Sequence, residues 1–363
     1  MRVLAFGSYD ARRHPRVGVL VDGLREHGVV VDECNVPLRL DTADRVRMLQ
    51  QPWRLPLLVV ELLRTWLTLC LRARRLPRPD AVLVGYLGHF DVLLARRLFR
   101  GLPVVHDLLV FAADTARDRG AGGLKQRLLR RLDAAAVGAS DLLVVDTEEH
   151  RQALPADRRP DGVVVPVGAP AAWVTSRPQP RSGPLRVVFF GLYTPLQNAP
   201  VIGAALALLA DTDLEVTMIG TGQDLPRTRA LAGPAPHVTW RDWVEPDALP
   251  ALVAAADVCL GIFAAEGKGT RVVPNKVFQG AAAGCAIITS DTPPQRRLLG
   301  DAALLVPAGD AEALAAALRG LAADRGRLLE LRLAAWTLAT QTMTPRAVVA
   351  PLLSRLSREV PVP

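Results

Sequence analysis

Two apolar segments, residues 2–6 and 185–190, each run directly into a glycine that is followed by a helix-forming stretch. The glycines are Gly7 and Gly191. An apolar strand, a glycine turn, a helix and a further apolar strand form the βαβ unit of a parallel sheet. We therefore expect an α/β chain with two Rossmann-like, doubly wound parallel sheets. The first unit lacks Gly-x-Gly-x-x-Gly, so the sequence does not support dinucleotide binding.

The length and the position of a proline- and glycine-rich stretch predict how the chain divides. A chain of 363 residues favours two domains. We expect an N-terminal domain over 1–166, a linker over 167–184, a second domain over 185–343 and a terminal helix over 344–363 that can cross back to the first domain. The strand-end loops of both domains are expected to face a common cleft, which suits one ligand gripped from two sides.

The charge balance is basic, with 44 Lys and Arg against 36 Asp and Glu and a formal net charge of +8. This excess suits nucleic acid, an anionic membrane or a phosphorylated substrate. The pattern of aromatic and basic residues typical of a nucleic-acid module is missing, so we expect no nucleic acid as partner. Four widely spaced cysteines without metal-ligand spacing predict reduced thiols and no metal. The first residues begin a strand, so we expect a cytoplasmic protein without a signal peptide.

Residues 267–290 combine a basic loop with a helix start. The chain has three lysines, and two of them, Lys268 and Lys276, lie here with Arg271 between them. Pro274 and Asn275 suit the first turn of a helix, which we expect to stop at Gly284 before a buried strand over 286–289. Cations beside a helix N-terminus favour an anion such as a phosphate. The alternative is a solvated basic loop.

Residues Leu55–Leu71 form the most apolar predicted helix. It is short for a transmembrane span and contains Glu61 and Arg64. Its flanking aromatic and basic residues are compatible with peripheral contact with the inner face of the membrane, although a packed helix is the default for such a pattern. These residues are Trp53, Trp66, Arg54, Arg72, Arg74 and Arg75. The alternative is a helix docked on the sheet that exposes a polar stripe.

A strand over 103–105 delivers His106 and Asp107 to its carboxyl end, where open parallel sheets bind ligands. A histidine and a carboxylate in this position can hold a hydroxyl or a phosphate oxygen. The alternative is a structural histidine. The other histidines have no partner spacing and are interpreted as structural or surface residues. They are His14, His27, His89, His150 and His237.

Several short motifs, taken in order and spacing, resemble glycosyltransferase family 4, which has the GT-B fold, and the resemblance covers nearly the whole chain. The motifs are Tyr9-Asp10 with His14-Pro15-Arg16, Pro103-Val104-Val105-His106-Asp107, Val145-Asp146-Thr147 with His150, Val165-Pro166-Val167-Gly168-Ala169, Phe189-Phe190-Gly191, Ile219-Gly220-Thr221-Gly222, and Pro274-Asn275-Lys276-Val277-Phe278-Gln279 with Gly284 and Ile287-Ile288-Thr289-Ser290-Asp291.

The resemblance implies that the second domain binds a nucleotide-sugar donor. Lys268, Arg271 and Lys276 are then the candidates for holding the leaving diphosphate. The remaining implied donor residues are Gly7, Gly191, Gly220, Gly222, Trp243, Val244 and Gln279. His106 corresponds to the family's histidine near the sugar and diphosphate, and it is the catalytic candidate together with Asp107.

The sequence departs from the family pattern at the donor site. Two glutamates eight positions apart are usual in the family, and Arg271 and Gln279 stand in their places. Gln279 can hydrogen-bond ribose hydroxyls, whereas Arg271 cannot accept hydrogen bonds as a glutamate does. The usual lysine after the first glycine loop is also missing, because that segment reads Pro195-Leu196-Gln197-Asn198.

The resemblance implies transfer of a sugar from a nucleotide donor, with UDP as the expected carrier, to a hydroxyl acceptor with retention of configuration. No cofactor or metal is implied. The acceptor is either a cell-envelope or lipid-linked glycan or a small natural product. Two alternatives stay open: a non-catalytic partner subunit with an eroded site, and an isomerase or hydrolase acting on the same donor.

Overall fold

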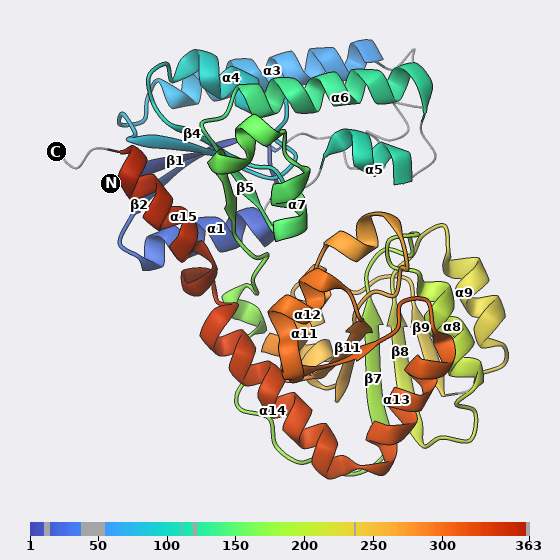
Figure 1. Ribbon diagram of the computed structural model, residues 1–363. Coiled ribbons are helices and arrows are strands. Elements are labelled where there is room, and N and C mark those ends of the chain that lie inside the picture. The colour runs from blue at the N-terminus through green and yellow to red at the C-terminus, as the bar shows by residue number, and fades with distance from the viewer. Residues whose placement is uncertain (11–14, 38–54, 110, 119–121, 236, 361–363) are drawn as a thin grey trace. The chain divides into compact units, whose positions relative to one another are not determined.

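The computed structural model divides into two compact units, and each is built on a six-stranded parallel sheet (Figure 1). Unit 1 consists of Met1–Asp146, His150–Val165 and Val349–Pro363, and unit 2 of Thr147–Glu149 and Pro166–Val348. The structure describes residues 1–10, 15–37, 55–109, 111–118, 122–235 and 237–360. His14, Trp53 and Arg54, which enter the predictions above, lie outside these ranges.

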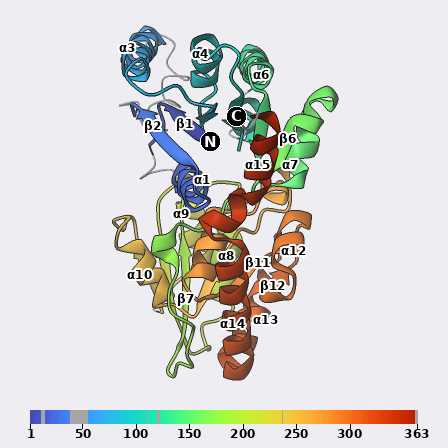
Figure 2. The same ribbon diagram turned by 90° about the vertical axis from the view of Figure 1, so that its left-hand side faces the viewer.

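The sheet of unit 1 has the strand order β2-β1-β3-β4-β5-β6. Its strands are β1 (Arg2–Gly7), β2 (Val30–Asn35), β3 (Ala81–Val84), β4 (Val104–Asp107), β5 (Leu142–Val145) and β6 (Gly162–Val164). The helices of this half of the chain are α1 (Pro15–Glu26), α3 (Leu55–Ala73), α4 (Asp91–Leu98), α5 (Ala112–Asp118), α6 (Gly123–Gly138), α7 (Glu148–Ala153) and the 3₁₀ turn η2 (Ala156–Asp161). Helices α3, α4 and α6 lie side by side over one face of this sheet, and α1 lies over the other (Figure 2).

Coverage of both faces explains why the strands are apolar without alternation. Leu4 and Phe6 of β1 pack with Leu69 of α3 in one buried cluster. The residues between them, Val3 and Ala5, are equally buried toward the opposite face. A parallel strand between two helical layers has no solvent side, so each position gains from being apolar.

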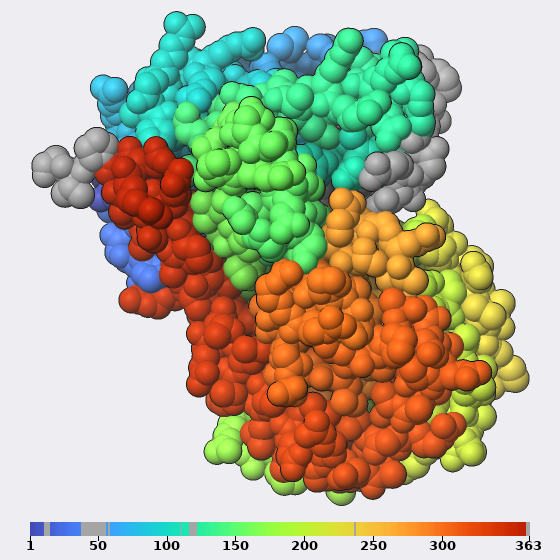
Figure 3. Space-filling view, in the orientation of Figure 1, coloured from blue at the N-terminus to red at the C-terminus, as the bar shows by residue number. Residues whose placement is uncertain are grey.

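The sheet of unit 2 has the order β12-β11-β10-β7-β8-β9. Its strands are β7 (Leu185–Phe190), β8 (Leu214–Ile219), β9 (Val238–Arg241), β10 (Val258–Leu260), β11 (Ala286–Ser290) and β12 (Ala303–Val306). The helices that follow the linker are α8 (Ala199–Ala207), α9 (Leu225–Ala232), α10 (Leu249–Ala254), α11 (Asn275–Ala282), α12 (Pro293–Leu299), α13 (Ala311–Ala323), α14 (Arg325–Thr342) and α15 (Pro345–Glu359), with the 3₁₀ turns η3 (Ala171–Trp173), η4 (Gly267–Arg271) and η5 (Gly300–Ala302). In Figure 3 the orange and red-orange surface of unit 2 is formed by the segments from η4 to α14.

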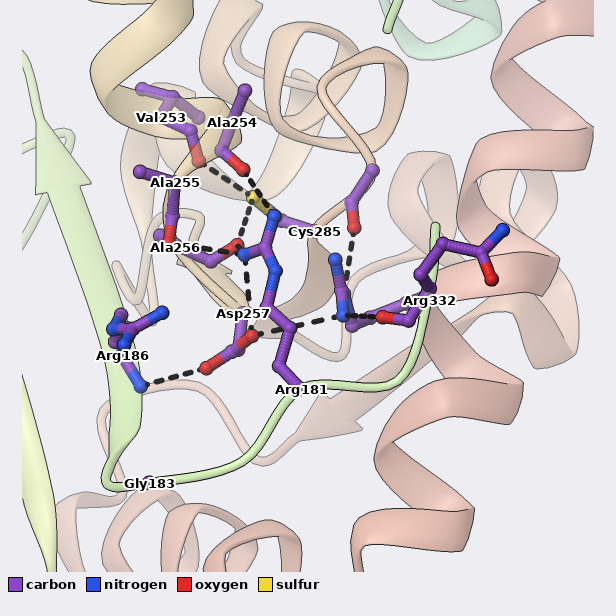
Figure 4. Close-up of polar contacts among 12 residues, drawn as sticks. Arg181, Gly183, Arg186, Val253, Ala254, Ala255, Ala256, Asp257, Cys285 and Arg332 are labelled. Atoms are coloured by element: carbon purple, nitrogen blue, oxygen red, sulfur yellow. Dashed lines mark hydrogen bonds and ion pairs between the residues drawn. The ribbon is translucent and has the colours of Figure 1, made fainter. Parts of the chain in front are cut away.

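The predicted linker lies against unit 2. Arg181 donates to the carbonyls of Ala254, Ala255 and Ala256 at 2.8–3.0 Å and to the Asp257 carboxylate at 3.3 Å (Figure 4). Arg332 of α14 donates to the carbonyl of Gln179 at 2.9 Å. Since each guanidinium group donates hydrogen bonds to several acceptors at once, the residues near Arg181 are fixed against unit 2.

The predicted strands agree with the observed ones to within a few residues, and the two six-stranded parallel sheets confirm the predicted fold class. The predictions missed four short helices, α5, α7, α9 and α12. Residues 290–294, after the strand predicted over 286–289, have the composition of a turn, but Pro293 already opens α12. Proline suits a first helical turn as well as it suits a loop, so composition alone does not separate the two. The common cleft stays a prediction.

Candidate functional site

Three glycines bring two loops of unit 2 together at the carboxyl edge of its sheet. Gly191 ends β7 with φ +138°, and Gly220 and Gly222 follow β8 with φ +120° and +153°. A Cβ on Gly220 would collide with the carbonyl oxygen of Gly191, and one on Gly222 with the backbone of Tyr193. Only glycine permits both this backbone conformation and this close approach. The two loops therefore offer bare backbone at the edge where parallel sheets bind ligands.

The ammonium group of Lys276 lies directly beside this edge. Lys276 belongs to the first turn of α11 and is 4% exposed. Its Nζ donates to Oε1 of Gln197 at 2.5 Å and lies 3.6 Å from the centroid of the Phe189 ring. A Cβ on Gly191 would come within 3.3 Å of Nζ. The side chain thus carries its amine from α11 back to the first glycine loop of unit 2.

The partners of Lys276 are neutral. No carboxylate of the described residues forms an ion pair with it. Burial lowers the pKa of Lys276 to about 7, while interaction with Cys259 acts in the opposite direction. A buried ammonium without an anion is costly, and proteins usually pair such a group. An anion arriving at the glycine edge would supply the missing partner.

Helix α11 is placed by close packing on β10. A Cβ on Gly280 would come within 2.6 Å of the Cys259 side chain, and the Cys259 thiol donates to the carbonyl of Lys276 at 3.5 Å. The glycine lets helix and strand approach closely, as the small residues of the sequence predict. Because the helix backbone is fixed in this way, the start of α11 is directed at the carboxyl edge.

The other predicted donor residues of this region lie before and within α11. Lys268 and Arg271 belong to η4, which is a single 3₁₀ turn where the sequence predicted an irregular loop. Gln279 is buried in α11, three residues after Lys276. The structure describes no direct contact among Lys268, Arg271 and Lys276, so the roles of the first two rest on proximity in sequence. Their roles in donor binding stay predictions.

Trp243 and Val244 follow β9 at the same edge. Trp243 is 70% exposed, and its indole nitrogen donates to Glu245 Oε1 at 3.3 Å. The loop is joined to the glycine turn, because the amide of Gly220 donates to the carbonyl of Arg241 at 2.8 Å. An exposed indole beside bare backbone provides an apolar face for a planar ring.

In unit 1, Gly7 ends β1 with φ +146° and packs against Asp91. The Asp91 carboxylate accepts the amide and hydroxyl of Ser8 at 2.8 and 2.7 Å and the indole N–H of Trp66 at 3.1 Å. The glycine therefore makes room for the side chain that begins α4. The contact with Asp91 explains why residue 7 is a glycine without reference to any ligand.

His106 and Asp107 lie at the carboxyl end of β4, as predicted, and both are buried. Asp107 accepts hydrogen bonds from Nε and Nη2 of Arg16 at 3.2 Å each. Burial raises the pKa of Asp107, and Arg16 opposes that shift. Neither ring nitrogen of His106 has a hydrogen-bond partner, and burial lowers its pKa well below the usual value. In this conformation the Asp107 carboxylate pairs with Arg16, whereas His106 is neutral and makes no hydrogen bond through its ring nitrogens.

Sequence reasoning missed the partners of these residues. Gln197 and Phe189 contact the Lys276 amine. From the sequence, Gln197 was noted only within the segment that lacks the family's usual lysine, and Phe189 only as part of a strand. Arg16 was quoted for the resemblance but not linked to Asp107, which lies 91 positions away. Among the residues that the structure describes, no group of three His, Cys, Asp or Glu side chains could hold a metal.

Comparison with known proteins places unit 2 in a recognised family. Residues 184–324 match the family model "Glycosyl transferases group 1". The chain is 34% identical over 175 residues to a phosphatidyl-myo-inositol mannosyltransferase of Mycolicibacterium smegmatis, and 31% identical over 171 residues to the protein of that name from Mycobacterium leprae. The first alignment covers 45% of this chain, and both cover 44% of the relative. The chain thus matches less than half the length of these relatives.

The fold comparison extends over the whole chain. Sucrose-phosphate synthase from Thermosynechococcus elongatus superimposes with a TM-score of 0.70 at 14% identity, covering 99% of this chain and 98% of that one. HepE from Anabaena, solved in complex with UDP and glucose, gives a TM-score of 0.67 at 13% identity over 99% and 100% of the two chains. At these identities the likeness shows the fold, and the fold is GT-B.

Proposed function

We propose that this chain, which belongs to the GT-B glycosyltransferases through its group 1 domain, transfers a sugar from a nucleotide-sugar donor to a hydroxyl acceptor. The observation that carries the proposal is the buried amine of Lys276. It lies at a glycine-lined strand edge without an anionic partner among the described residues. The diphosphate of a nucleotide sugar has the charge and the oxygen atoms that this amine and the adjoining backbone would bind.

The proposed reaction separates charge between two groups. The bond from the anomeric carbon to the diphosphate oxygen breaks, and its electron pair stays on the diphosphate. The acceptor oxygen bonds to the anomeric carbon on the face that the diphosphate leaves, so configuration is retained. A diphosphate oxygen takes the proton of the acceptor hydroxyl. Lys276 would stabilise the growing negative charge, which preorganised cations do well in a dry site.

Arg271 and Lys268 are proposed to add positive charge from η4 as the diphosphate leaves. Gln279 and the Trp243–Val244 loop would contact the nucleoside, through hydrogen bonds to ribose and through the exposed indole face. UDP is the proposed carrier, supported by the structure of HepE in complex with UDP and glucose. No residue of this chain is assigned to selection of uracil.

The acceptor is proposed to be a lipid-linked or envelope glycan or another membrane-held hydroxyl compound. The relatives named above act on phosphatidyl-myo-inositol. In this chain α3 exposes a stripe of Val59, Leu63, Leu67 and Leu71 with basic residues after its end. Such a helix suits peripheral contact with an anionic bilayer. Among the described residues no helix is both long and apolar enough to cross a bilayer.

A non-catalytic binding subunit is the second candidate, and one observation favours it. Arg271 and Gln279 stand where carboxylates are usual in the family that the sequence resembles. The buried amine would then bind a nucleotide without turnover. Nucleotide binding and sugar transfer therefore need separate measurements.

The test is a thermal-shift screen of UDP, GDP and ADP and their glucose and mannose derivatives, followed by turnover of the best donor. A ligand that binds only the native state raises the melting temperature. We expect one nucleotide series to stabilise the wild type and Lys125→Ala, which removes a lysine of α6 in unit 1, but not Lys276→Ala. Absence of any nucleotide effect on the wild type would contradict both candidates. Binding without consumption of donor, with or without acceptors, would favour the binding subunit.

Peripheral membrane contact has its own test. Flotation with vesicles of phosphatidylcholine containing phosphatidylglycerol is expected to carry the wild type at low salt and less of it at high salt. Leu63→Ser/Leu67→Ser should reduce flotation at every salt concentration, because it removes the apolar part of the contact. Recovery with the phosphatidylglycerol-containing vesicles at low salt that is no higher than recovery with no vesicles would contradict the proposal.

A further inference from the structure

The amino edge of the unit 1 sheet carries the same hexapeptide pattern twice. Residues 73–78 read Ala-Arg-Arg-Leu-Pro-Arg, and residues 95–100 read Ala-Arg-Arg-Leu-Phe-Arg. The first copy begins at Ala73, the last residue of α3, and leads to β3, whereas the second begins inside α4 at Ala95 and ends two residues beyond that helix, before β4. Helices α3 and α4 lie side by side and β3 pairs with β4, so the two copies meet in space (Figure 1, Figure 2).

The two copies line a cavity of about 260 Å³ that is open to the surface. Eight of its ten lining residues are apolar, with the β1 residue Leu4, which is 1% exposed, among them. The other two are Arg78 and Arg100, the last arginines of the two copies, and both are exposed.

The positive charge of this cavity is not used inside the protein. Among the described residues, neither Arg78 nor Arg100 forms a hydrogen bond or an ion pair. The nearby carboxylate of Asp80 accepts the amide of Arg2 at 2.7 Å and is not part of the wall.

Stabilisation of helix C-termini explains the arginines in the last turns or within two residues of them, Arg100 included, but not Arg78. Arg96 and Arg97 lie in the last turn of α4, and Arg74 and Arg75 directly follow α3, where cations interact favourably with the helix dipole. Arg78 lies five residues beyond the end of α3, and the dipole effect fades within the last turn. A guanidinium at an apolar cavity is instead suited to bind a phosphate that carries an apolar group.

We propose that the cavity between the two arginine-rich turns is a binding site for a phosphate ester with an apolar chain. Arg78 and Arg100 hold the phosphate, and Leu4, Leu98 and Phe99 contact the first carbons of the chain. The ester comes either from an anionic lipid of the bilayer or from a free alkyl phosphate. The site lies at the amino edge of the sheet, opposite the carboxyl edge that holds Gly7 and Asp107, so it goes beyond the proposed transfer reaction.

The test compares two double variants with equal loss of charge. Arg78→Gln/Arg100→Gln removes the cavity arginines, and Arg75→Gln/Arg97→Gln removes the matched exposed arginines of the same two turns that do not line the cavity. Co-sedimentation with vesicles of phosphatidylcholine and phosphatidylglycerol is expected to weaken at least tenfold in the first variant and less than threefold in the second. Ala73→Phe, which fills the cavity without a change of charge, should resemble the first variant.

Hexyl phosphate and inorganic phosphate distinguish the source of the ester. Hexyl phosphate should raise the melting temperature of the wild type and not that of Arg78→Gln/Arg100→Gln, whereas inorganic phosphate should act weakly on both. Binding of hexyl phosphate together with vesicles supports a bilayer lipid, and binding of hexyl phosphate alone supports a free ester. No effect of hexyl phosphate on the wild type, or the same effect on Arg78→Gln/Arg100→Gln, would overturn the site, and equal vesicle loss in both double variants would overturn a bilayer lipid as the source of the ester. The nucleotide-induced thermal shift should be unchanged throughout, which separates this site from donor binding.

Discussion

The carboxyl edges of the two sheets each hold a buried cation, and the two cations are treated differently. In unit 1, Arg16 is 2% exposed and pairs with Asp107 and with the carbonyl of Val165. In unit 2, Lys276 is 4% exposed and has only the Gln197 amide and the Phe189 ring. The first charge is satisfied by the fold, whereas the second is left for a ligand. A buried charge indicates a binding site only when the protein does not neutralise it itself.

The largest effect is expected from breaking the satisfied pair. Arg16→Met should lower the free energy of unfolding of unit 1 by about 3–5 kcal/mol, because it leaves Asp107 buried without a counter-charge. Urea denaturation followed by circular dichroism measures this loss. Adding Asp107→Leu to Arg16→Met should recover a large part of it. An undiminished loss in the double variant would mean that packing, not charge pairing, explains the first result.

Removing the unsatisfied cation should have the opposite effect on stability. Lys276→Met is expected to leave the melting temperature unchanged or higher at pH 7, because the substitution leaves no buried carboxylate without a counter-charge. Nucleotide affinity should fall by about 10²–10³-fold, by analogy with the loss of one preorganised donor to a developing oxyanion. Calorimetric titration measures the affinity, and Lys125→Met is the matched control. A destabilised variant that still binds nucleotide normally would indicate that Lys276 is structural.

Giving Lys276 an internal partner should make unit 2 resemble unit 1. Gln197→Glu places a carboxylate where the amide oxygen now lies 2.5 Å from Nζ. We expect a higher melting temperature together with roughly tenfold weaker nucleotide binding, because the new carboxylate competes with the diphosphate for the amine. Thermal shift with and without nucleotide measures both quantities. Tighter nucleotide binding by this variant would contradict the comparison.

The last effect is a pH dependence, and its sign follows from the lowered pKa of Lys276. Since its folded pKa of about 7 lies below the unfolded value of 10.5, the unfolded chain binds more protons between these values. The cost of burying the charged amine is therefore complete below about pH 7. The free energy of unfolding rises with pH above about 7 as that cost is relieved. A bound diphosphate favours the charged amine, so nucleotide affinity should fall by up to tenfold per pH unit above 7. Titrations from pH 7 to 9 should show this slope in the wild type and not in Lys276→Met.

The sequence predicted the strands well because their signal is local. Residues 185–190 form an apolar run that is interrupted only at Arg186 and ends before Gly191, and such runs occur where helices cover both faces of a sheet. The short helices α5 and α7 were missed, because seven and six residues carry too few turns for a periodic pattern.

The candidate site was predicted in its members but not in its chemistry. Lys276 and the glycines Gly191 and Gly220 were named from motifs and lie at one edge. Whether each charge is paired depends on residues far apart in the chain, 79 positions for Gln197 with Lys276 and 91 for Arg16 with Asp107. Sequence alone could therefore treat Asp107 and Lys276 as equal candidates, and only the packed structure separates them.

The most direct measurement uses the small number of lysines. The chain has three, Lys125, Lys268 and Lys276, so protein labelled with ¹⁵N-lysine gives three side-chain signals, and Lys276→Met assigns one of them. We predict that this signal titrates with a pKa of about 7 in the free protein. Addition of saturating UDP should move its pKa upward by two units or more while the signal of Lys125, which lies in unit 1, stays unchanged. Three signals that all titrate near 10.5, with and without nucleotide, would contradict the claim that Lys276 is an unsatisfied cation awaiting a diphosphate.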